Sequence, residues 1–408
     1  MGLFDRFRRT KSEASPIDTA EKLAREVGLT WESVSGRSVS VNQAMRLTTV
    51  FGCIRVLSES MGMLPCRLMH RDGRSRKVAY DHPVHRLLSV APNEFMTAQE
   101  FMEQLILCLA TRGNFYAYKV RGLGGQVVEL LPMFPGSVRP KLDEQWNPVY
   151  EVTFRDGSTD VLSQREIWHV RLMSLDGLVG LSPIGYAREA IALGLDTEEH
   201  GAQLFKNGAV TTGVLHTDQT LTDAAYKRLR SDFEERHQGL ANNHRPLILE
   251  GGLKWQSVAL NAEDSQFLET RKFQRDEICA IFRVPPHLVA NLEKATFSNI
   301  EHQGINFINY ALVPYMTRIE QRANIGLLRA EDAGRYYAKF NAGGLMRGDL
   351  KSRYESYGRG IQWGILSPND CRELEDLNPR DGGDIYLTPT NMTTKPEGSD
   401  DEKASEAA

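Results

Sequence analysis

The chain has 408 residues, of which 41% are hydrophobic and 25% are charged. This length and composition are typical of a soluble globular protein with roughly two to four domains. The 49 Lys and Arg residues against 53 Asp and Glu residues give a formal charge of −4, which excludes a protein that binds nucleic acid over its whole surface and leaves only local contacts.

The five cysteines are scattered and contain no C-x-x-C pair, so the sequence indicates neither a disulfide framework nor a zinc site. We therefore expect a reducing, cytoplasmic environment. No run approaches the ~18 apolar residues that are needed to cross a bilayer, so we expect no membrane association. Residues 1–30 are expected to form a flexible N-terminal arm, and residues 381–408 a flexible acidic tail.

The first well-marked element lies near the middle of the N-terminal half. Thr97 and Glu100 have the spacing of a capping box, and apolar residues then recur at helical spacing until Gly113, which predicts an α-helix. From residue 114 to residue 170, short β-rich runs are separated by Gly, Pro, Asn and Asp. This pattern predicts an antiparallel sheet packed on the helix, and therefore an α+β fold class.

Two long helices follow the sheet. Ser182 and Pro183 suit the start of a helix of about 25 residues that ends at Gly208. Its apolar stripe is narrow: Ile184, Ala187, Ile191 and Leu195. A second helix is predicted over residues 265–283, where Pro285 and Pro286 end the pattern. Helices this long with so few apolar residues need not bury their faces within their own domain.

A compact insert separates the two helices. It contains a strand near residues 212–216 and a helix over residues 223–238. The runs RPLILE and LKWQSVAL, joined by Gly251 and Gly252, predict a β-hairpin.

A further helical pattern follows Pro286 and contains Pro314. Because proline has no N–H, the main-chain bond to Tyr310 is lost, and we expect the helix to bend there. Residues 348–360 and a short helix capped by Ser367 and Pro368 predict a small C-terminal helical unit.

The sequence contains no motif for catalysis or for a cofactor. A P-loop, G-x-G-x-x-G, H-E-x-x-H and G-x-S-x-G are all absent, so we expect no enzyme activity, no cofactor and no metal. His82 and His85 have a spacing that metal ligands can have, but packing roles are favoured. Glu198, Glu199 and His200 are interpreted as a solvated helix face rather than an acid–base site. For three aromatic residues, helix packing is favoured over ligand stacking: Phe205, Phe267 and Phe273.

The order of several short stretches resembles the portal proteins of long-tailed double-stranded DNA phages. The resemblance runs from the start of the chain to about residue 391 and is carried by HPVHRLLSVAPNEFMTAQEF, RGNFYAY, DGLVGLSPI, FKNGAVTTGVL, VPPHLV, ATFSNIEHQ, LVPYMTRIEQ and GILSPNDCRELEDLNPRDGGD. Each stretch is short, and their joint order makes the match specific. The pair Asn324-Ile325 before GLL departs from the family pattern and puts one local turn in doubt.

The resemblance implies a ring, commonly of twelve subunits, at one vertex of the capsid, through which double-stranded DNA enters and leaves. It divides the chain into a wing (31–181), a first stem helix (182–208), a clip (209–261), a second stem helix (262–285), a tunnel loop with a kinked helix that returns to the wing (286–344), and a helical crown (345–380). Twelve copies would carry a formal charge of about −48, which would repel phosphates and limit sticking.

The resemblance also places two candidate sites. The tunnel loop that faces DNA would comprise Asn291, Glu293, Lys294, Ala295, Thr296, Phe297, Ser298 and Asn299. Lys294 read alone is an ordinary exposed lysine and Phe297 a residue that covers the loop, whereas in a ring Lys294 becomes a circle of positive charge. A docking surface on the clip would comprise Ala241, Asn242, Asn243, His244 and Arg245.

The partners that the resemblance implies are further copies of the chain, double-stranded DNA bound without sequence specificity, the large terminase subunit, a head–tail connector, and a major capsid or scaffold protein. The protein would be assembled in the bacterial cytoplasm and reside in the virion. The alternative is a head–tail adaptor ring without a direct packaging role, but a short adaptor would not carry a separate wing, stem and crown. An enzyme would need a group of catalytic residues that the sequence does not contain.

Overall fold

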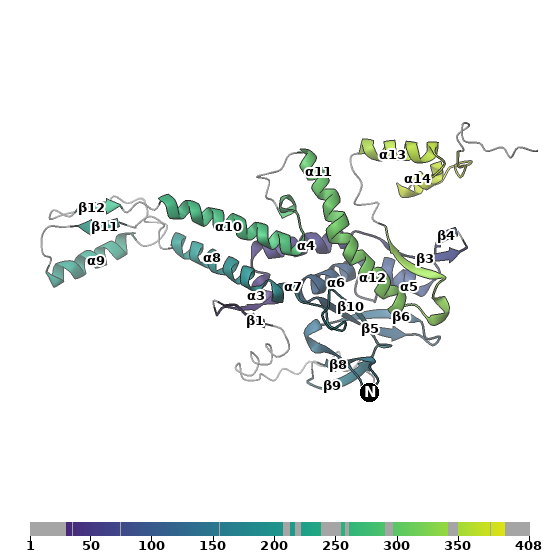
Figure 1. The fold of residues 1–408 in the computed structure, drawn as a ribbon, viewed down its shortest axis with the longest axis horizontal. Coiled ribbons are helices and arrows are strands. Elements are labelled where there is room, and N and C mark those ends of the chain that lie inside the picture. Colours follow the sequence, from purple (N-terminus) through teal and green to yellow (C-terminus); the bar gives the residue numbers. More distant parts are fainter. Residues whose placement is uncertain are drawn as a thin grey trace, which may run out of the picture. The chain divides into compact units, whose positions relative to one another are not determined.

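A computed structural model describes residues 30–341, except residues 35, 74, 155, 207–212, 217–221, 238–253, 258–260 and 290–296, and residues 350–387, except residue 376. The chain divides into two compact units, Met1–Asn341 and Ala342–Ala408. All the described strands belong to the first unit (Figure 1). The described residues combine helices with antiparallel sheets, so the predicted α+β class is confirmed.

The helices of the first unit are α3 (Val41–Ala44), α4 (Thr48–Gly62), α5 (Pro83–Ser89), α6 (Ala98–Arg112), α7 (Pro183–Tyr186), α8 (Arg188–Lys206), α9 (Asp223–His237), α10 (Asn261–Phe282), α11 (Phe297–Asn306) and α12 (Val313–Gly326). A π-helix, η3 (Phe307–Leu312), joins α11 to α12. Short 3₁₀ turns are η1 (Pro135–Ser137), η2 (Pro286–Val289) and η4 (Ala330–Asp332).

The strands pair only with antiparallel neighbours in the described part of the chain. One sheet has the order β10 (Ile167–Arg171), β5 (Asn114–Arg121), β6 (Val127–Met133), and a second the order β7 (Val138–Leu142), β8 (Pro148–Thr153), β9 (Thr159–Ser163). A third has the order β13 (Tyr336–Phe340), β3 (Cys66–Asp72), β4 (Ser75–Val78). Two pairs complete the set: β1 (Thr30–Glu32) with β2 (Ser38–Ser40), and β11 (Gly213–His216) with β12 (Lys254–Ser257).

Helix α6 begins and ends as its sequence predicts. The Glu100 amide donates to Thr97 Oγ1 at 3.2 Å, and the Thr97 amide donates to Glu100 Oε2 at 2.8 Å, which completes the capping box. The helix ends at Gly113, whose φ is +75°. A Cβ there would lie 2.1 Å from the Leu181 carbonyl oxygen, so this close crossing of two chain segments requires glycine.

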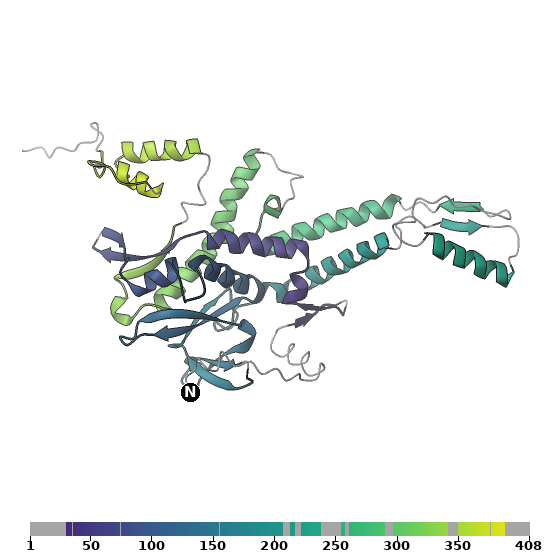
Figure 2. The same cartoon turned by 180° about the vertical axis from the view of Figure 1, so that it is seen from behind.

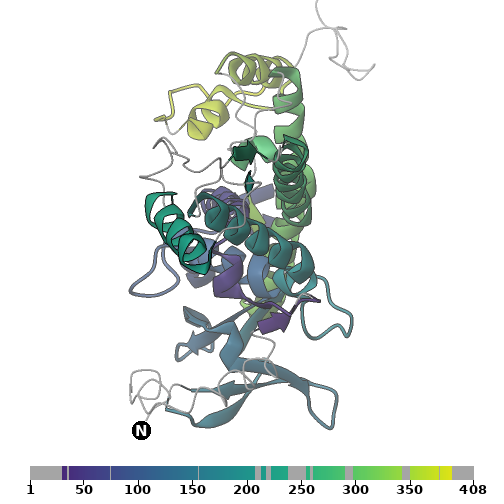
Figure 3. The ribbon, with the colours of Figure 1, turned by 90° about the vertical axis from the view of Figure 1, so that its left-hand side faces the viewer.

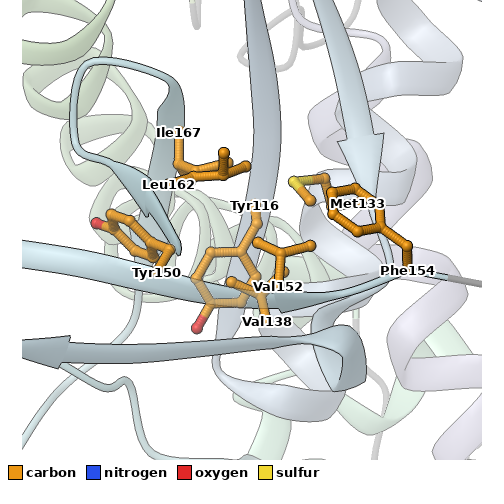
Figure 4. Packing of buried hydrophobic residues seen from close by; sticks show 8 residues of the cluster. All are labelled: Tyr116, Met133, Val138, Tyr150, Val152, Phe154, Leu162 and Ile167. Atoms are coloured by element: carbon orange, nitrogen blue, oxygen red, sulfur yellow. The ribbon is translucent and has the colours of Figure 1, made fainter. Parts of the chain in front are cut away.

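Two cores lie on the two faces of the sheet β10-β5-β6, and Figures 1 and 3 both show α6 on one face and β7-β8-β9 on the other. Because side chains alternate along a strand, neighbours on β5 enter different cores. Tyr116 packs with Tyr150 and Ile167 between the two sheets, in a cluster that Figure 4 shows with its other members: Met133, Val138, Val152, Phe154 and Leu162.

The core beneath α6 is aromatic. The Phe101 and Phe115 rings meet edge to face with centroids 5.4 Å apart, and Trp168 lies 6.2 Å from Phe115. Edge-to-face contacts of this kind stabilise aromatic pairs beyond the area they bury. All three side chains are at most 2% exposed, so they form a closely buried centre between α6 and the sheet β10-β5-β6.

The helix predicted from Ser182 to Gly208 is interrupted. Ser182 caps α7 through the Gly185 amide, as expected, but the chain leaves helical geometry at Ala187, and α8 begins at Arg188. The guanidinium of Arg188 donates to the Gly185 carbonyl at 3.2 Å. In a continuous α-helix this carbonyl would accept from the main-chain amide of residue 189. The predicted apolar stripe is correct, since Ile184, Ala187, Ile191 and Leu195 are all buried.

The second long helix and the insert also follow the pattern, with adjusted bounds. Helix α10 starts at Asn261, four residues before the predicted start, and ends at Phe282, ahead of the two prolines. Helix α9 and strand β11 match the predicted helix and strand. Strand β12 pairs with β11, while the run RPLILE of the predicted hairpin lies outside the described residues.

The second unit contains α13 (Leu350–Gln362) and α14 (Pro368–Leu374) among its described residues. Ser367 caps α14 in a capping box with Asp370, which confirms the predicted start. The Asn369 side chain donates to the Arg380 carbonyl at 3.0 Å and to Asp384 at 2.9 Å, so it holds the following turn against the helix.

Candidate functional site

The candidate site is the helix pair α8 and α10 together with the helical segment that follows α10. Both Figures 1 and 2 show α8 and α10 side by side. Near the sheets the pair is apolar, with Ile191 and Ile278 both at most 2% exposed. Farther along it is polar, because Gln274 donates to Thr197 at 3.3 Å and Arg271 lies 4.0 Å from Glu198.

Side chains from other elements hold the pair in place. The guanidinium of Arg37, in the segment between β1 and β2, pairs with Asp196 and Glu199 of α8, and the hydrogen bond with Asp196 is the main cause that raises the pKa of Arg37. On α10, the buried Cys279 Sγ lies 3.9 Å from Cys53 Sγ of α4. Helix α8 is therefore joined through its middle to the segment between β1 and β2, and α10 packs near its C-terminal end on α4.

The faces of the pair away from these contacts expose large apolar side chains. Phe273 is 69% exposed and Leu193 is 52% exposed, and the nearby Tyr186 of α7 is 67% exposed. The packing role favoured for Phe273 is therefore not satisfied within one chain. Single exposed apolar residues are ordinary, and these three, one each on α7, α8 and α10, are the candidates for contact with another protein.

The segment after α10 has π-helical bonding beside Pro314, where the sequence predicts a bend. The Val313 amide donates to the Ile308 carbonyl, five residues back, so the residues before Pro314 have π-helical rather than α-helical bonding. The Tyr310 carbonyl, which Pro314 cannot serve, accepts a hydrogen bond from Arg283 Nη1 at 3.2 Å. The predicted loss of the bond to Tyr310 is thus resolved by a π-turn and by a side chain from the end of α10.

Helix α12 is fixed firmly to the sheet β10-β5-β6. The Trp168 indole donates to the Arg322 carbonyl at 2.9 Å. The ammonium of Lys119 donates to the Gly326 carbonyl at 3.1 Å and to the Gln164 carbonyl at 2.9 Å. Lys119 is only 4% exposed, and its burial lowers the pKa to about 8.

The opposite side of α12 is bound to strand β13. Asn324 Oδ1 accepts from the Ala338 amide at 2.7 Å, and Glu320 accepts from the Phe340 amide at 2.9 Å. Asn324 belongs to the pair that departs from the family pattern, and here its side chain joins helix to strand. In contrast to α12, none of the described side chains from His302 to Asn306 in α11 is buried.

Most of the predicted site residues cannot be compared with the structure. Asn291, Glu293, Lys294, Ala295 and Thr296 lie outside the described residues, as do the clip residues 241–245. Phe297, Ser298 and Asn299 form the first turn of α11. Their assignment to a tunnel loop therefore stays a prediction.

The histidines and carboxylates considered in the sequence have packing and pairing roles. His82 accepts from the Val84 amide at 3.2 Å as the cap of α5, and buried His85 accepts from the Leu68 amide at 3.3 Å. Glu199 pairs with Arg37 at 3.1 Å on a solvated face. Phe205 and Phe267 have side chains outside the described set.

The sequence did not predict the roles of two cations, Arg283 and Lys119. Arg283 binds a carbonyl of η3, and Lys119 binds a carbonyl at the end of α12. A signal existed for Arg283, because it directly precedes Val-Pro-Pro, where a helix must end and its last side chain is free to reach elsewhere. Lys119 had no signal, since a lysine at a strand position normally points to solvent.

The described residues include no group of three or more His, Cys, Asp or Glu side chains placed to hold a metal ion. Among the same residues, no helix has the length and hydropathy that a membrane span requires.

Comparison with protein families identifies one family. The model of the phage portal protein family matches residues 48–376. The portal protein of Enterobacteria phage HK97 is 33% identical over 371 residues, which cover 88% of this chain and 87% of that protein. The probable portal protein of Streptomyces phage phiC31 is 34% identical over 374 residues, covering 88% and 81%.

Solved structures share the fold. A chain from the neck of a native gene transfer agent particle with C12 symmetry superposes with a TM-score of 0.57 at 24% identity, covering 89% of this chain and 100% of that one. An HK97-family phage portal protein from Corynebacterium diphtheriae gives a TM-score of 0.54 at 16% identity, covering 74% and 95%. The family match over most of the length and the two portal proteins above 30% identity lead to one conclusion: the chain belongs to the phage portal protein family.

Proposed function

We propose that the chain is the structural subunit of a closed ring at one capsid vertex, through which double-stranded DNA is packaged and ejected. The observation that carries the proposal is the exposed apolar surface of α7, α8 and α10, at Tyr186, Leu193 and Phe273, in a chain of the portal family. In a ring, each subunit presents one face to its neighbour, and the neighbour covers what a single chain leaves exposed.

The number of subunits that we propose is twelve. A structural neighbour of this chain comes from a particle neck with C12 symmetry, which supports this number, and another comes from a neck with C6 symmetry. Assembly would take place in the bacterial cytoplasm together with a capsid or scaffold protein. The α8–α10 pair would then be the stem, and the sheets with α6 the wing.

The charge of the chain supports passage of DNA rather than tight binding. Each phosphate contact adds to affinity by releasing counterions, so a channel through which DNA slides needs few of them. The formal charge of −4 in each subunit makes the ring acidic as a whole. Sparse contacts from Lys294 would guide the duplex without reading its sequence.

The clip would be the docking surface for the terminase and, later, for the head–tail connector. The chain leaves α8 at Lys206 and returns to α10 at Asn261, and the strands β11 and β12 between them pair with each other. This insert has a long helix at each end, and its two described strands pair with each other. It is therefore suited to act as a separate binding unit. Residues 241–245 are the proposed contact.

The test is a packaging assay with a phage that lacks its portal gene. When this protein is supplied, capsids should contain DNA that resists nuclease, and tails should join. Capsids assembled without it should stay empty. If capsids that lack the protein package DNA to the same level, the proposal is contradicted. If capsids that lack the protein package DNA normally and fail only to join tails, the adaptor ring is favoured instead.

A further inference from the structure

One hydrogen bond crosses from the end of α10 to the interior of the next long helix. Arg283 Nη1 donates to the Tyr310 carbonyl at 3.2 Å. In an α-helix that carbonyl would accept from residue 314, but Pro314 has no N–H to donate. The guanidinium therefore takes the place of a missing main-chain donor in a different helix.

The backbone at Arg283 is one that favours glycine. Its φ is +56°, in the left-handed region. The Arg283 amide donates to the Ala280 carbonyl at 3.1 Å, and the Val284 amide donates to the Cys279 carbonyl at 3.0 Å, which is the bonding of a Schellman helix end. At this position most helices that end in this way have glycine, because a Cβ is unfavourable there. An arginine here carries a backbone cost, and its side chain supplies the compensating contact.

A second contact joins two neighbouring segments. His287 Nδ1 of η2 and Gln303 Oε1 of α11 lie 2.6 Å apart. Upstream, Phe282 and Val284 are buried, so the end of α10 is packed in place. Downstream, α12 is held by Trp168. Among the described residues between them lie η2, α11 and η3, and the two contacts join the end of α10 to η3 and η2 to α11.

We propose that Arg283 is a positioning residue that sets the orientation of η3 and α11 relative to the end of α10. Its use during DNA passage rests on the proposed function, whereas the positioning itself does not. The π-helical bonding of η3 supports this role, because the donor register of the helix shifts beside Pro314, where the Tyr310 carbonyl accepts from Arg283.

The test compares Arg283→Gly, Arg283→Lys and Trp146→Gly in the full-length protein by hydrogen–deuterium exchange. Glycine suits the backbone at Arg283, so Arg283→Gly should fold normally and lose only the side-chain contact. Trp146 is the matched control, because its φ is +63°, its side chain is 80% exposed, and it lies in the turn between β7 and β8.

In Arg283→Gly, exchange of the amides in residues 300–312 should rise about three- to tenfold, the range expected for loss of one net hydrogen bond. Arg283→Lys retains a donor and should show a smaller rise, and Trp146→Gly none. Exchange at the wild-type rate in Arg283→Gly would overturn the proposal. An equal rise in α6 would overturn it too, since that would mark general loss of stability.

The consequence for DNA is measured separately, as the amount of DNA per particle. Arg283→Gly should lower it with rings intact, and Arg283→Lys should be closer to wild type. Raised exchange with unchanged packaging would overturn the coupling to DNA and leave the positioning role standing. If wild-type protein forms no ring and packages nothing, the proposed function fails, and the exchange result still decides the role of Arg283.

Discussion

At the scale of single residues, buried polar groups orient the sheets β10-β5-β6 and β7-β8-β9. His169 is 4% exposed on β10, with Nε2 3.1 Å from Asn114 Oδ1 and Nδ1 3.4 Å from the Tyr150 hydroxyl. Because Asn114 Oδ1 can only accept, Nε2 carries the proton and Nδ1 accepts from Tyr150. His169 is thus a neutral imidazole that joins β10 to β5 and β8.

This arrangement predicts a loss of stability in acid. Burial, with smaller effects from Arg171 and Arg322, lowers the pKa of His169 from 6.5 to about 3. Between these values the unfolded chain binds a proton that the folded chain does not, so stability falls as pH falls from 6.5 toward 3. The contribution approaches about 1.4 kcal/mol per pH unit within this window.

The measurement is urea unfolding of wild type and His169→Gln at several pH values from 7 to 4. The carboxylates titrate in both proteins, so the difference between their free energies of unfolding at each pH isolates the effect of His169. We expect the wild type to lose its advantage as pH falls. A difference that stays constant over this range would show that His169 is not held neutral.

Lys294 gives a prediction about DNA. Lys294→Ala should leave folding and ring formation nearly intact, because the contact proposed for Lys294 is with DNA and not with its own chain or a neighbouring subunit. It should reduce the DNA packaged or retained, and the effect should shrink as salt screens the contact. The readout is packaged genome length.

Lys227→Ala is the control for this change, because Lys227 is an exposed lysine of α9. It should package as wild type does. If both variants behave like wild type, or if the Lys294 variant unfolds, the proposed contact with DNA is wrong.

At the scale of elements, local signals predicted what depends on local contacts. The cap of α6, the cap of α14 and the antiparallel strands after Asn114 follow from residue types at fixed spacing, and the structure confirms them. The break between α7 and α8 could not be predicted in this way. It depends on the Arg188 side chain, and a Cβ at Gly185 would lie 2.6 Å from the Trp31 ring, far away in sequence.

The same reasoning explains the partial success at the candidate site. Pro314 was sufficient to predict that the main-chain bond to Tyr310 is lost, because the missing N–H is a property of one residue, whereas the bend expected there stays a prediction. The sequence could not show that η3 is π-helical or that Arg283 serves Tyr310, since both depend on how α10 ends against another helix. The tunnel-loop and clip assignments come from the family resemblance alone.

The clip gives a prediction at this scale. Deleting residues 241–245 should leave soluble rings, because the proposed ring contacts lie on α7, α8 and α10. Packaging or tail joining should be impaired. A five-residue Gly-Ser replacement at the same position keeps the length and separates loss of side chains from shortening. Normal phage yield from both variants would remove the docking role.

At the scale of the whole molecule, we propose a structural role without catalysis. We expect the purified full-length chain, free of terminase, to hydrolyse no ATP and to cleave no DNA, because the sequence has no nucleotide-binding or hydrolytic motif. Steady-state ATP turnover and nuclease assays check this. Robust turnover that purifies with the chain would refute the structural role.

We propose the ring because apolar side chains of α7, α8 and α10, at Tyr186, Leu193 and Phe273, are exposed in the single chain. Imaging of the full-length protein by electron microscopy, alone and together with capsid and scaffold proteins, tests it most directly. We expect closed rings with cyclic symmetry, twelve subunits and an axial channel. Compact monomers at micromolar concentration, with capsid and scaffold proteins also present, would contradict it.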